Sequence, residues 1–230
     1  MIRSLYNEFM ETSIIIRVKN ERNNLEKLFK ILKSQTYQDF ELIIVNDSST
    51  DESERVVFDF FPKDRVRIVN IEKFSYPKAC NLGAEKAKGK YLVYLSAHSF
   101  PVSNTWLADG LSNFENKNVA GVFAYPIPGK DSTLAEKISG FPNKIKKGGH
   151  LGNTNSIIRK DLWEKHKFDE GLIISEDYEW SLYWEKKDFE IINDPKLRVY
   201  HSHHLGFLGI IKRQLKWKKS REIVNKKFKN

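Results

Sequence analysis

Three short segments of this sequence carry ionisable side chains at spacings that could do chemistry: SAH at 96–98, SED at 175–177 and HSHH at 201–204. Carboxylates accept or donate protons during catalysis, and imidazoles bind divalent metals or carry protons near neutral pH. The first segment ends an apolar run, YLVYLSAHS at 91–99, and the ends of strands often carry functional groups in α/β proteins.

The histidines of HSHH are spaced like a pair of metal ligands. His201 and His203 project to the same side of a regular strand, and zinc is the first candidate for such a pair. Histidines on an edge strand that contact only solvent fit the same spacing, so both interpretations stay open here.

Two further features allow a structural and a functional interpretation. Glu176 and Asp177 begin an expected helix, where adjacent carboxylates can simply interact with the helix dipole. Asp47 follows an expected strand, where it can accept hydrogen bonds from a nucleotide base or ribose, or act as an ordinary cap or turn residue.

The elements that must position these residues alternate between strand and helix. Near-continuous apolar runs predict buried strands at 13–18, 40–46, 65–70 and 90–96. Helical patterns lie between them, at 23–35, 49–61 and 77–89. Further on, helices are expected at 104–115 and 175–188, and strands at 119–126 and 198–204. This order predicts an α/β fold with a mostly parallel central sheet flanked by helices.

The composition indicates a globular protein. The 230 residues are 40% hydrophobic and 30% charged, and no apolar run reaches the roughly 18 residues of a membrane span. The sequence shows no signal-peptide pattern. Cys80 is the one cysteine, so an intrachain disulfide is excluded, and a cytoplasmic location is expected.

The charge is concentrated in the C-terminal segment. The formal net charge is +9, and the residues after Gly206 hold nine lysines and arginines against one acid, Glu222, for a net +8. Leu208, Ile211 and Leu215 share one helical face there. We therefore divide the chain into a domain at 1–205 and a basic amphipathic extension at 206–230. The extension favours an anionic membrane surface, at the inner face of the cytoplasmic membrane, over nucleic acid; a helix packed on the domain is the alternative.

Two common nucleotide-binding motifs are absent from the sequence. The turn after the first expected strand, RVKNERNN at 17–24, contains no glycine, which a Rossmann dinucleotide site requires. No Walker A sequence occurs either. A nucleotide would have to be held in another way.

Four separated segments resemble, in order, the family 2 nucleotide-sugar glycosyltransferases, which have a GT-A fold. They are SIIIRVKNERNNLEKLFKILKSQTYQDFELIIVNDSSTDES (13–53), FSYPKACNLGAEKAKGKYLVYLSAHSFP (74–101), NTNSIIRKDLWEKHKFDEGLIISEDYEWSLYWEKK (153–187) and RVYHSH (198–203). The resemblance covers roughly residues 13–203 and is closest to bacterial polysaccharide and rhamnosyltransferase-like enzymes. It implies a nucleotide-binding set of Asp47 at the base, the loop residues Arg17, Lys19, Asn20 and Glu21, and Lys78 near the diphosphate.

The resemblance also implies a divalent metal, Mn²⁺ or Mg²⁺, at the end of the fourth strand. The family places Asp-x-Asp there, but this sequence reads Ser96-Ala97-His98. Histidine can still bind Mn²⁺, and Ser96 can bond a phosphate or a metal-bound water. The departure predicts metal binding that is weaker or dispensable, with His98 assisted by His201 or His203.

SEDYEW at 175–180 resembles the Glu-Asp motif of the family. This implies that Asp177 is the catalytic base of an inverting transfer and that Glu176 is its neighbour. The donor would be a nucleoside-diphosphate sugar, with UDP or dTDP favoured over GDP. The acceptor would be a hydroxyl of a surface polysaccharide or lipid-linked glycan. A catalytically impaired subunit that binds nucleotide or glycan, and a sugar nucleotidyltransferase, are the alternatives.

Overall fold

The chain forms an α/β fold around a central sheet, as the sequence predicted. The computed structural model describes residues 10–138, 146–147 and 149–228. The sheet has the strand order β3-β2-β1-β4-β8-β6-β9-β7. Its strands are β1 (Thr12–Val18), β2 (Phe40–Asn46), β3 (Val66–Asn70), β4 (Tyr91–Ser96), β6 (Val119–Phe123), β7 (Lys146–Lys147), β8 (Asn155–Arg159) and β9 (Glu190–Asn193). β5 (Phe100–Pro101) and β10 (Val199–Tyr200) form a separate antiparallel pair.

One half of the sheet is parallel and the other is mixed. β3, β2, β1 and β4 run in the same direction, and β1 lies between β2 and β4. β8 is antiparallel to both β4 and β6, whereas β6 and β9 are parallel. Ile14, Ile15 and Ile16 of β1 are all buried, which explains why the parallel strands read as continuous apolar runs.

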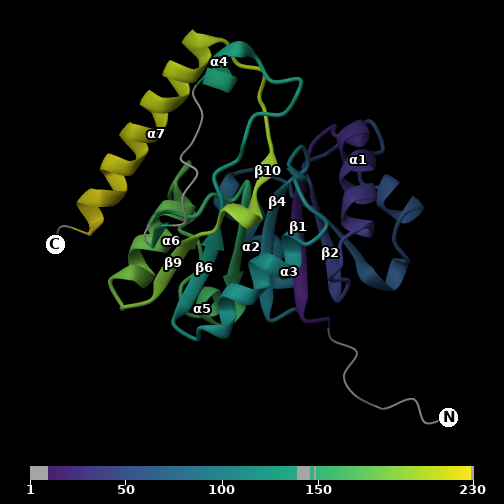
Figure 1. Ribbon diagram of the computed structural model, residues 1–230, viewed down its shortest axis with the longest axis horizontal. Coiled ribbons are helices and arrows are strands. Elements are labelled where there is room, and N and C mark those ends of the chain that lie inside the picture. Colours follow the sequence, from purple (N-terminus) through teal and green to yellow (C-terminus); the bar gives the residue numbers. More distant parts are fainter. Residues whose placement is uncertain (1–9, 139–145, 148, 229–230) are drawn as a thin grey trace.

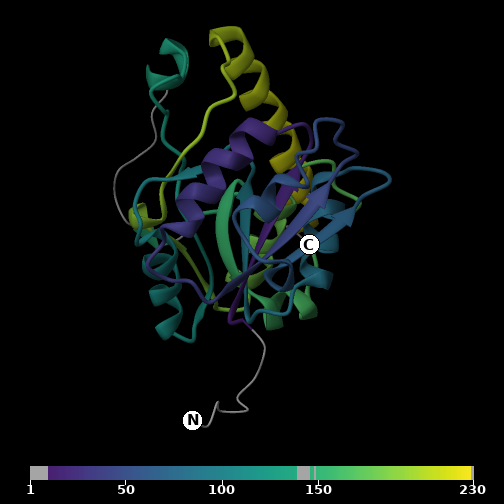
Figure 2. The ribbon, with the colours of Figure 1, turned by 90° about the vertical axis from the view of Figure 1, so that its right-hand side faces the viewer.

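Helices cover both faces of the sheet (Figures 1 and 2). The helices are α1 (Arg22–Lys33), α2 (Tyr76–Lys86), α3 (Trp106–Ser112), α4 (Leu134–Ile138), α5 (Lys160–Lys165), α6 (Glu176–Glu185) and α7 (Phe207–Lys227). One core cluster contains Phe29 of α1 and Trp106 of α3. The other contains Cys80 of α2, Trp163 of α5 and Trp180 of α6. α1 and α3 therefore pack on one face, and α2, α5 and α6 on the other.

The helix expected at 49–61 is wrong. The chain there forms a loop and a short 3-10 turn, Val56–Asp59. The capping-type residues of this loop instead serve the beginning of α1. Ser53 Oγ accepts a hydrogen bond from the Glu21 backbone amide at 2.7 Å, and Asp51 Oδ2 accepts one from Arg22 at 3.1 Å. Glu21 offers α1 no side-chain cap of its own, so a segment distant in sequence supplies it.

The C-terminal segment forms one long helix, α7, which begins after Gly206. Its second half packs on the domain: Val224 is buried with Leu172 and Tyr178. Figure 1 shows α7 along one side of the molecule, with α4 beside its first turns and α6 near its last. None of the helices in the described part of the chain is long and apolar enough to cross a membrane.

Candidate active site

The parallel strands bring three loops, those that follow β1, β2 and β4, to one edge of the sheet. β1 and β2 are in register at Val18 and Asn46, and β1 and β4 are in register at Arg17 and Ser96. Because these strands end together, the residues that follow them gather at the same edge. These residues are Lys19, Asn20, Glu21, Asp47, Ala97 and His98.

The loops after β1 and β2 are joined by hydrogen bonds. Lys19 Nζ lies 2.9 Å from Asp47 Oδ2. The Asn20 side chain accepts a hydrogen bond from the Thr50 backbone amide at 2.8 Å, and the Asn20 amide donates to Ser49 Oγ at 3.1 Å. Asn20 has the positive φ of 55°, which asparagine tolerates better than most residues. The two loops therefore present Lys19 and Asp47 together at the edge of the sheet.

Arg17 points away from this pair. Its guanidinium donates to the Asn153 carbonyl at 2.8 Å and to Cys80 Sγ at 3.3 Å. It also lies 5.5 Å from the centre of the Tyr76 ring, in the first turn of α2. Lys78 is in that same turn, where its amide donates to the capping hydroxyl of Ser75. Arg17 thus contacts the residue that holds the carboxylates of α6, and its positive charge acts to lower the pKa of both Glu176 and Asp177.

Asn153 holds the two carboxylates at the start of α6. Its backbone amide donates to Asp177 Oδ2 at 3.0 Å, and its side-chain amide donates to Glu176 Oε1 at 3.1 Å. The amide of Tyr178 donates to Asp177 Oδ1 at 2.8 Å. Ser175, just before the helix, has a left-handed backbone with φ 71°. These contacts fix both carboxylates in place.

Burial makes this carboxylate pair basic. It raises the pKa of Glu176 to about 7, with Asp177 as the second cause. Burial also raises the pKa of Asp177, although the amides of Asn153 and Tyr178 and the charge of Arg17 oppose the change. Two adjacent carboxylates in little water ionise less readily than isolated ones. The pair can therefore take up a proton near neutral pH, which a general base must do.

The three predicted histidines meet in one cluster. One ligand atom from each of His98, His201 and His203 lies within 4.8 Å of the others. The Nε2 atoms of His201 and His203 are 3.0 Å apart, and the rings of His98 and His201 stack at 4.7 Å. The strand expected at 198–204 ends at Tyr200, so the two histidines face each other from an irregular segment rather than from a strand. The His201 backbone amide donates to the Ile127 carbonyl at 3.0 Å.

In His98 and His201 the Nδ1 atom has a hydrogen-bonding partner of its own. His98 Nδ1 lies 2.8 Å from Glu21 Oε1, and His201 Nδ1 lies 3.0 Å from Ser99 Oγ. Burial, followed by the neighbouring His98 and His203, lowers the pKa of His201 well below its usual value. Burial also lowers the pKa of His203, so both of these imidazoles favour the neutral form, which is the form that binds metal. The donor set fits a divalent transition metal and offers none of the carboxylate oxygens that Mg²⁺ prefers.

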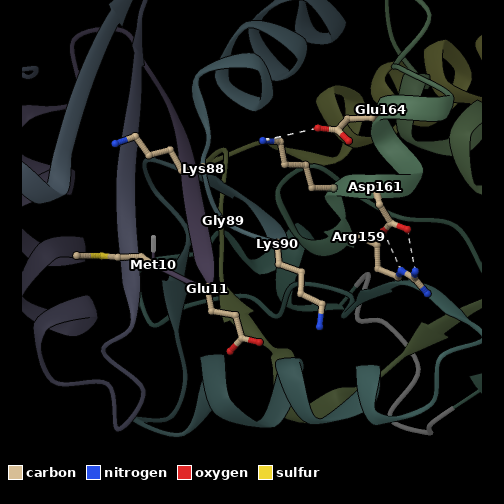
Figure 3. A pocket seen from close by; sticks show the side chains of 9 residues that line it. Met10, Glu11, Lys88, Gly89, Lys90, Arg159, Asp161 and Glu164 are labelled. Atoms are coloured by element: carbon tan, nitrogen blue, oxygen red, sulfur yellow. Dashed lines mark hydrogen bonds and ion pairs between the residues drawn. The ribbon is translucent and has the colours of Figure 1, made fainter. Parts of the chain in front are cut away.

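The histidines line a cavity of about 610 Å³. Its other lining residues come from the start of α1, from the segment before α4 and from the neighbourhood of β10; they include Glu21, Lys27, Lys130 and Tyr200. A second hollow of about 530 Å³ lies at the opposite end of β1 and β4 (Figure 3). There Arg159 pairs with Asp161 at 2.8 Å, and Lys160 with Glu164 at 3.8 Å.

Two residues that support the site had no functional role in the sequence interpretation. Asn153 is the first residue of the segment 153–187 that resembles the glycosyltransferase family, but nothing in the sequence shows that this asparagine contacts both carboxylates. Ser99 is fully buried, and its hydrogen bond to His201 crosses 102 positions of sequence. A contact at that separation exists only once the fold has formed. Ser96 itself is positioned by its backbone amide, which donates to the Thr154 carbonyl at 3.1 Å.

Known proteins resemble this chain in sequence. The model of the family described as Glycosyl transferase family 2 matches residues 13–169. The glycosyltransferase AglE of Haloferax volcanii is 29% identical over 185 residues, which are 74% of this chain and 59% of that protein. A GalNAc(5)-diNAcBac-PP-undecaprenol beta-1,3-glucosyltransferase of Campylobacter jejuni is 27% identical over 201 residues, which are 82% of this chain and 63% of that protein. The chain thus spans about three fifths of the length of these two relatives.

Solved structures resemble it in fold. The mannosyltransferase PcManGT of Pyrobaculum calidifontis, in complex with GDP-Man and Mn²⁺, superposes with a TM-score of 0.68 at 16% identity, covering 84% of this chain and 56% of that one. S. aureus TarS 1-349, in complex with UDP-GlcNAc, gives 0.64 at 17% identity, covering 86% of this chain and 60% of that one. At this level of identity the likeness concerns the fold, and it confirms the predicted GT-A-like architecture.

Proposed function

Because this chain belongs to glycosyl transferase family 2, we propose that it transfers a sugar from a nucleoside-diphosphate sugar to a hydroxyl of a growing surface polysaccharide or lipid-linked glycan, with inversion at the anomeric carbon. UDP and dTDP sugars are the donors we favour over GDP sugars. The name of the Campylobacter relative gives a glycan linked to undecaprenol diphosphate as its acceptor, which supports a lipid-linked acceptor here.

The observation that carries this proposal is the carboxylate pair that Asn153 holds. In the proposed reaction, Asp177 removes the proton from the acceptor hydroxyl as that oxygen attacks the anomeric carbon. The new carbon–oxygen bond forms while the bond between the anomeric carbon and the diphosphate breaks, and the nucleoside diphosphate leaves with the bonding electrons. Glu176 is the neighbour of this base, and the charge of Asp177 adds to burial in raising the pKa of Glu176, because one carboxylate disfavours ionisation of the other.

The donor would occupy the edge formed by the β1 and β2 loops. Asp47 would accept hydrogen bonds from the nucleotide base, exchanging its pairing with Lys19 for them. Asn20 and Glu21 would flank the ribose, and Lys78 would face the diphosphate. A divalent metal held by His98, His201 and His203 would offset charge on the departing diphosphate.

A donor panel tests the proposal. The purified chain is incubated with UDP-, dTDP- and GDP-sugars and a polyprenol diphosphate-linked acceptor, with Mn²⁺, Mg²⁺ or EDTA. We expect transfer with at least one donor, and Asp177→Asn should lower kcat about 10²–10⁴-fold, the usual contribution of a general base. Asp161→Asn is the matched control, because Asp161 lies at the opposite end of the sheet; it should keep wild-type turnover. Unchanged turnover in Asp177→Asn would remove the base assignment.

One alternative function has a specific observation in its favour. The family's aspartate pair is replaced by Ser96-Ala97-His98, which would suit a subunit that binds donor or glycan without turning it over. Binding of a nucleotide sugar with no transfer and no hydrolysis would support that alternative. A nucleotidyltransferase would instead make nucleotide sugar from a nucleoside triphosphate and a sugar phosphate, and the same protein preparation can be assayed for that product.

We also propose that the first half of α7, with α4, rests on an anionic membrane. Leu208 and Leu215 of α7 are 75% and 61% exposed, and Leu134 and Ile138 of α4 are 69% and 67% exposed. Figure 1 shows the two helices side by side at one end of the molecule. Lysines and arginines surround this apolar surface on α7, so both the hydrophobic and the electrostatic contributions to bilayer binding are present. The proposed location is the inner face of the cytoplasmic membrane, where a lipid-linked acceptor would be reached.

Vesicle sedimentation tests this surface. The chain should bind vesicles that contain phosphatidylglycerol and bind phosphatidylcholine vesicles far less, and added salt should weaken the binding. Leu208→Asp should abolish it. Val102→Asp, which changes an apolar residue 44% exposed elsewhere, should leave it intact. If Leu208→Asp binds like the wild type, or if the protein pairs with a second copy through α7 in sedimentation velocity instead, the membrane assignment is wrong.

A further inference from the structure

The histidine cluster differs chemically from a carboxylate metal site. Its three members supply imidazole nitrogens, and imidazole suits Zn²⁺, Ni²⁺ and Co²⁺ better than Mg²⁺. Affinity for such ligands also rises from Mn²⁺ towards Co²⁺ and Ni²⁺, with Zn²⁺ well above Mn²⁺. The identity of the ligands therefore points to a different metal from the Mg²⁺ or Mn²⁺ that the sequence resemblance implied.

We propose that His98, His201 and His203 form a preorganised three-imidazole site that binds Zn²⁺ far more tightly than Mg²⁺ or Mn²⁺ and does so without a sugar donor. This inference deepens the proposed function, since it concerns the same site and rests on its location beside the donor edge. Metal binding itself, however, can be measured in the absence of any donor or acceptor.

The spacing of the nitrogens is close to what zinc needs. At a Zn–N distance of about 2.0–2.1 Å, two ligands of a tetrahedral site stand roughly 3.3 Å apart. The Nε2 atoms of His201 and His203 are already 3.0 Å apart. All three ligand atoms lie within 4.8 Å of one another, so closing the widest separation by about 1.5 Å would complete a tetrahedral spacing. Three protein ligands leave a fourth position for water or a substrate oxygen, the arrangement of catalytic zinc sites.

The remaining ring nitrogens are held as they are in metal sites. Glu21 Oε1 accepts from His98 Nδ1 at 2.8 Å, and the hydroxyl of Ser99 bonds His201 Nδ1 at 3.0 Å. A metal-binding histidine commonly uses its second nitrogen in this way, because the bond fixes the ring and the tautomer. In both residues Nε2 is the nitrogen left for a metal.

The backbone around the histidines is also fixed before any ligand binds. Glu136 of α4 accepts hydrogen bonds from the amide of His203 at 3.0 Å and from the hydroxyl of Ser202 at 2.5 Å. The His201 amide is bonded to the Ile127 carbonyl. Because the segment is anchored on both sides of the pair, little conformational entropy remains to be lost on binding.

Isothermal titration of the full chain, stripped with EDTA and dialysed, tests the inference. We expect one equivalent of Zn²⁺ to bind at least 100-fold more tightly than Mn²⁺ or Mg²⁺. Co²⁺ should bind at the same site with the visible absorption of tetrahedral cobalt. His98→Ala and His203→Ala should each weaken Zn²⁺ binding at least tenfold, and Glu21→Gln should weaken it about 10–100-fold through the orientation of His98. Circular dichroism verifies that each variant is folded.

His204→Ala is the matched control, because His204 is an exposed neighbour in the same segment that is not part of the cluster; it should bind Zn²⁺ like the wild type. Equal affinities for Zn²⁺ and Mg²⁺, or Zn²⁺ binding that His98→Ala and His203→Ala leave unchanged, would overturn the inference. If Zn²⁺ binds as expected but no donor is used, the metal site stands and the proposed transfer fails. If transfer occurs with no Zn²⁺ binding, the reverse holds.

Discussion

Replacing Glu176 by glutamine should make the protein more stable at alkaline pH. Glu176 is 4% exposed, and burial together with Asp177 raises its pKa to about 7. Above that pH the native state must hold an ionised carboxylate in little water. Glutamine has nearly the same shape, carries no charge, and can still accept the hydrogen bond from the Asn153 side chain.

The magnitude follows from the difference between the two pKa values. The usual pKa of a glutamate in an unfolded chain is 4.5. Between pH 4.5 and pH 7 the unfolded chain has lost the proton and the native state still holds it, so stability falls as the pH rises. The full difference of roughly 2.5 units corresponds to about 3 kcal/mol at 1.36 kcal/mol per unit. Glu176→Gln should therefore be more stable than the wild type by about 3 kcal/mol at pH 8 and by about 1 kcal/mol at pH 5.

Urea unfolding followed by tryptophan fluorescence measures this difference. Wild type and variant are compared at both pH values in the absence of metal. Glu164→Gln is the control, because Glu164 is an exposed carboxylate whose ion pair with Lys160 is long at 3.8 Å; its stability should differ little from that of the wild type at either pH. A variant no more stable than the wild type at pH 8 would refute the reasoning. A gain equal at both pH values would show that ionisation is not its cause.

Three further predictions concern the site and the fold. Asn153→Ala removes the side-chain amide that donates a hydrogen bond to Glu176. We expect kcat to fall about tenfold and the acidic limb of the pH–rate profile to move to higher pH. An unshifted limb would contradict the positioning role of Asn153. Asp47→Asn should weaken UDP binding about tenfold in calorimetry, whereas unaltered binding would exclude Asp47 from the nucleotide site. Gly89→Ala should lower the free energy of unfolding by about 1–3 kcal/mol, because the added Cβ would lie 2.6 Å from the backbone nitrogen of Ser13. Gly152→Ala is the control, since the space around Gly152 is open, and its stability should be close to that of the wild type. Similar stabilities of the two variants would contradict the packing argument.

The parallel half of the fold was predictable from sequence because burial on both faces leaves a direct signature. The expected strand 40–46 coincides with β2, and all its residues are buried. The loop at 49–55 shows where the same approach fails. Its serines and acids have the composition of a helix start, but Asp51 and Ser53 bond to the amides at the start of α1. Local composition identified residues suited to capping a helix and could not show which helix they cap.

The candidate site was predictable to a similar degree. Spacing indicated that His201 and His203 face the same side, and they meet at 3.0 Å, although the strand that motivated the prediction ends before them. The direction of the Arg17 side chain could not be read from its position after an apolar run. Its guanidinium donates to the carbonyl of Asn153, a residue 136 positions away, and such a partner is set by the folded sheet.

The first turn of α6 connects the catalytic proposal with the membrane proposal. Tyr178 follows Asp177 directly; its hydroxyl donates to Asn225 Oδ1 of α7 at 2.7 Å, and Arg221 lies 5.2 Å from the centre of its ring. The amide of the same tyrosine donates to Asp177. α7 is thus fixed relative to the carboxylates by its second half, while the exposed apolar residues of its first half are left for a surface. Docking of that half would therefore set the orientation of Asp177 relative to the bilayer, and an acceptor whose lipid is held in the bilayer would meet the base in a defined direction.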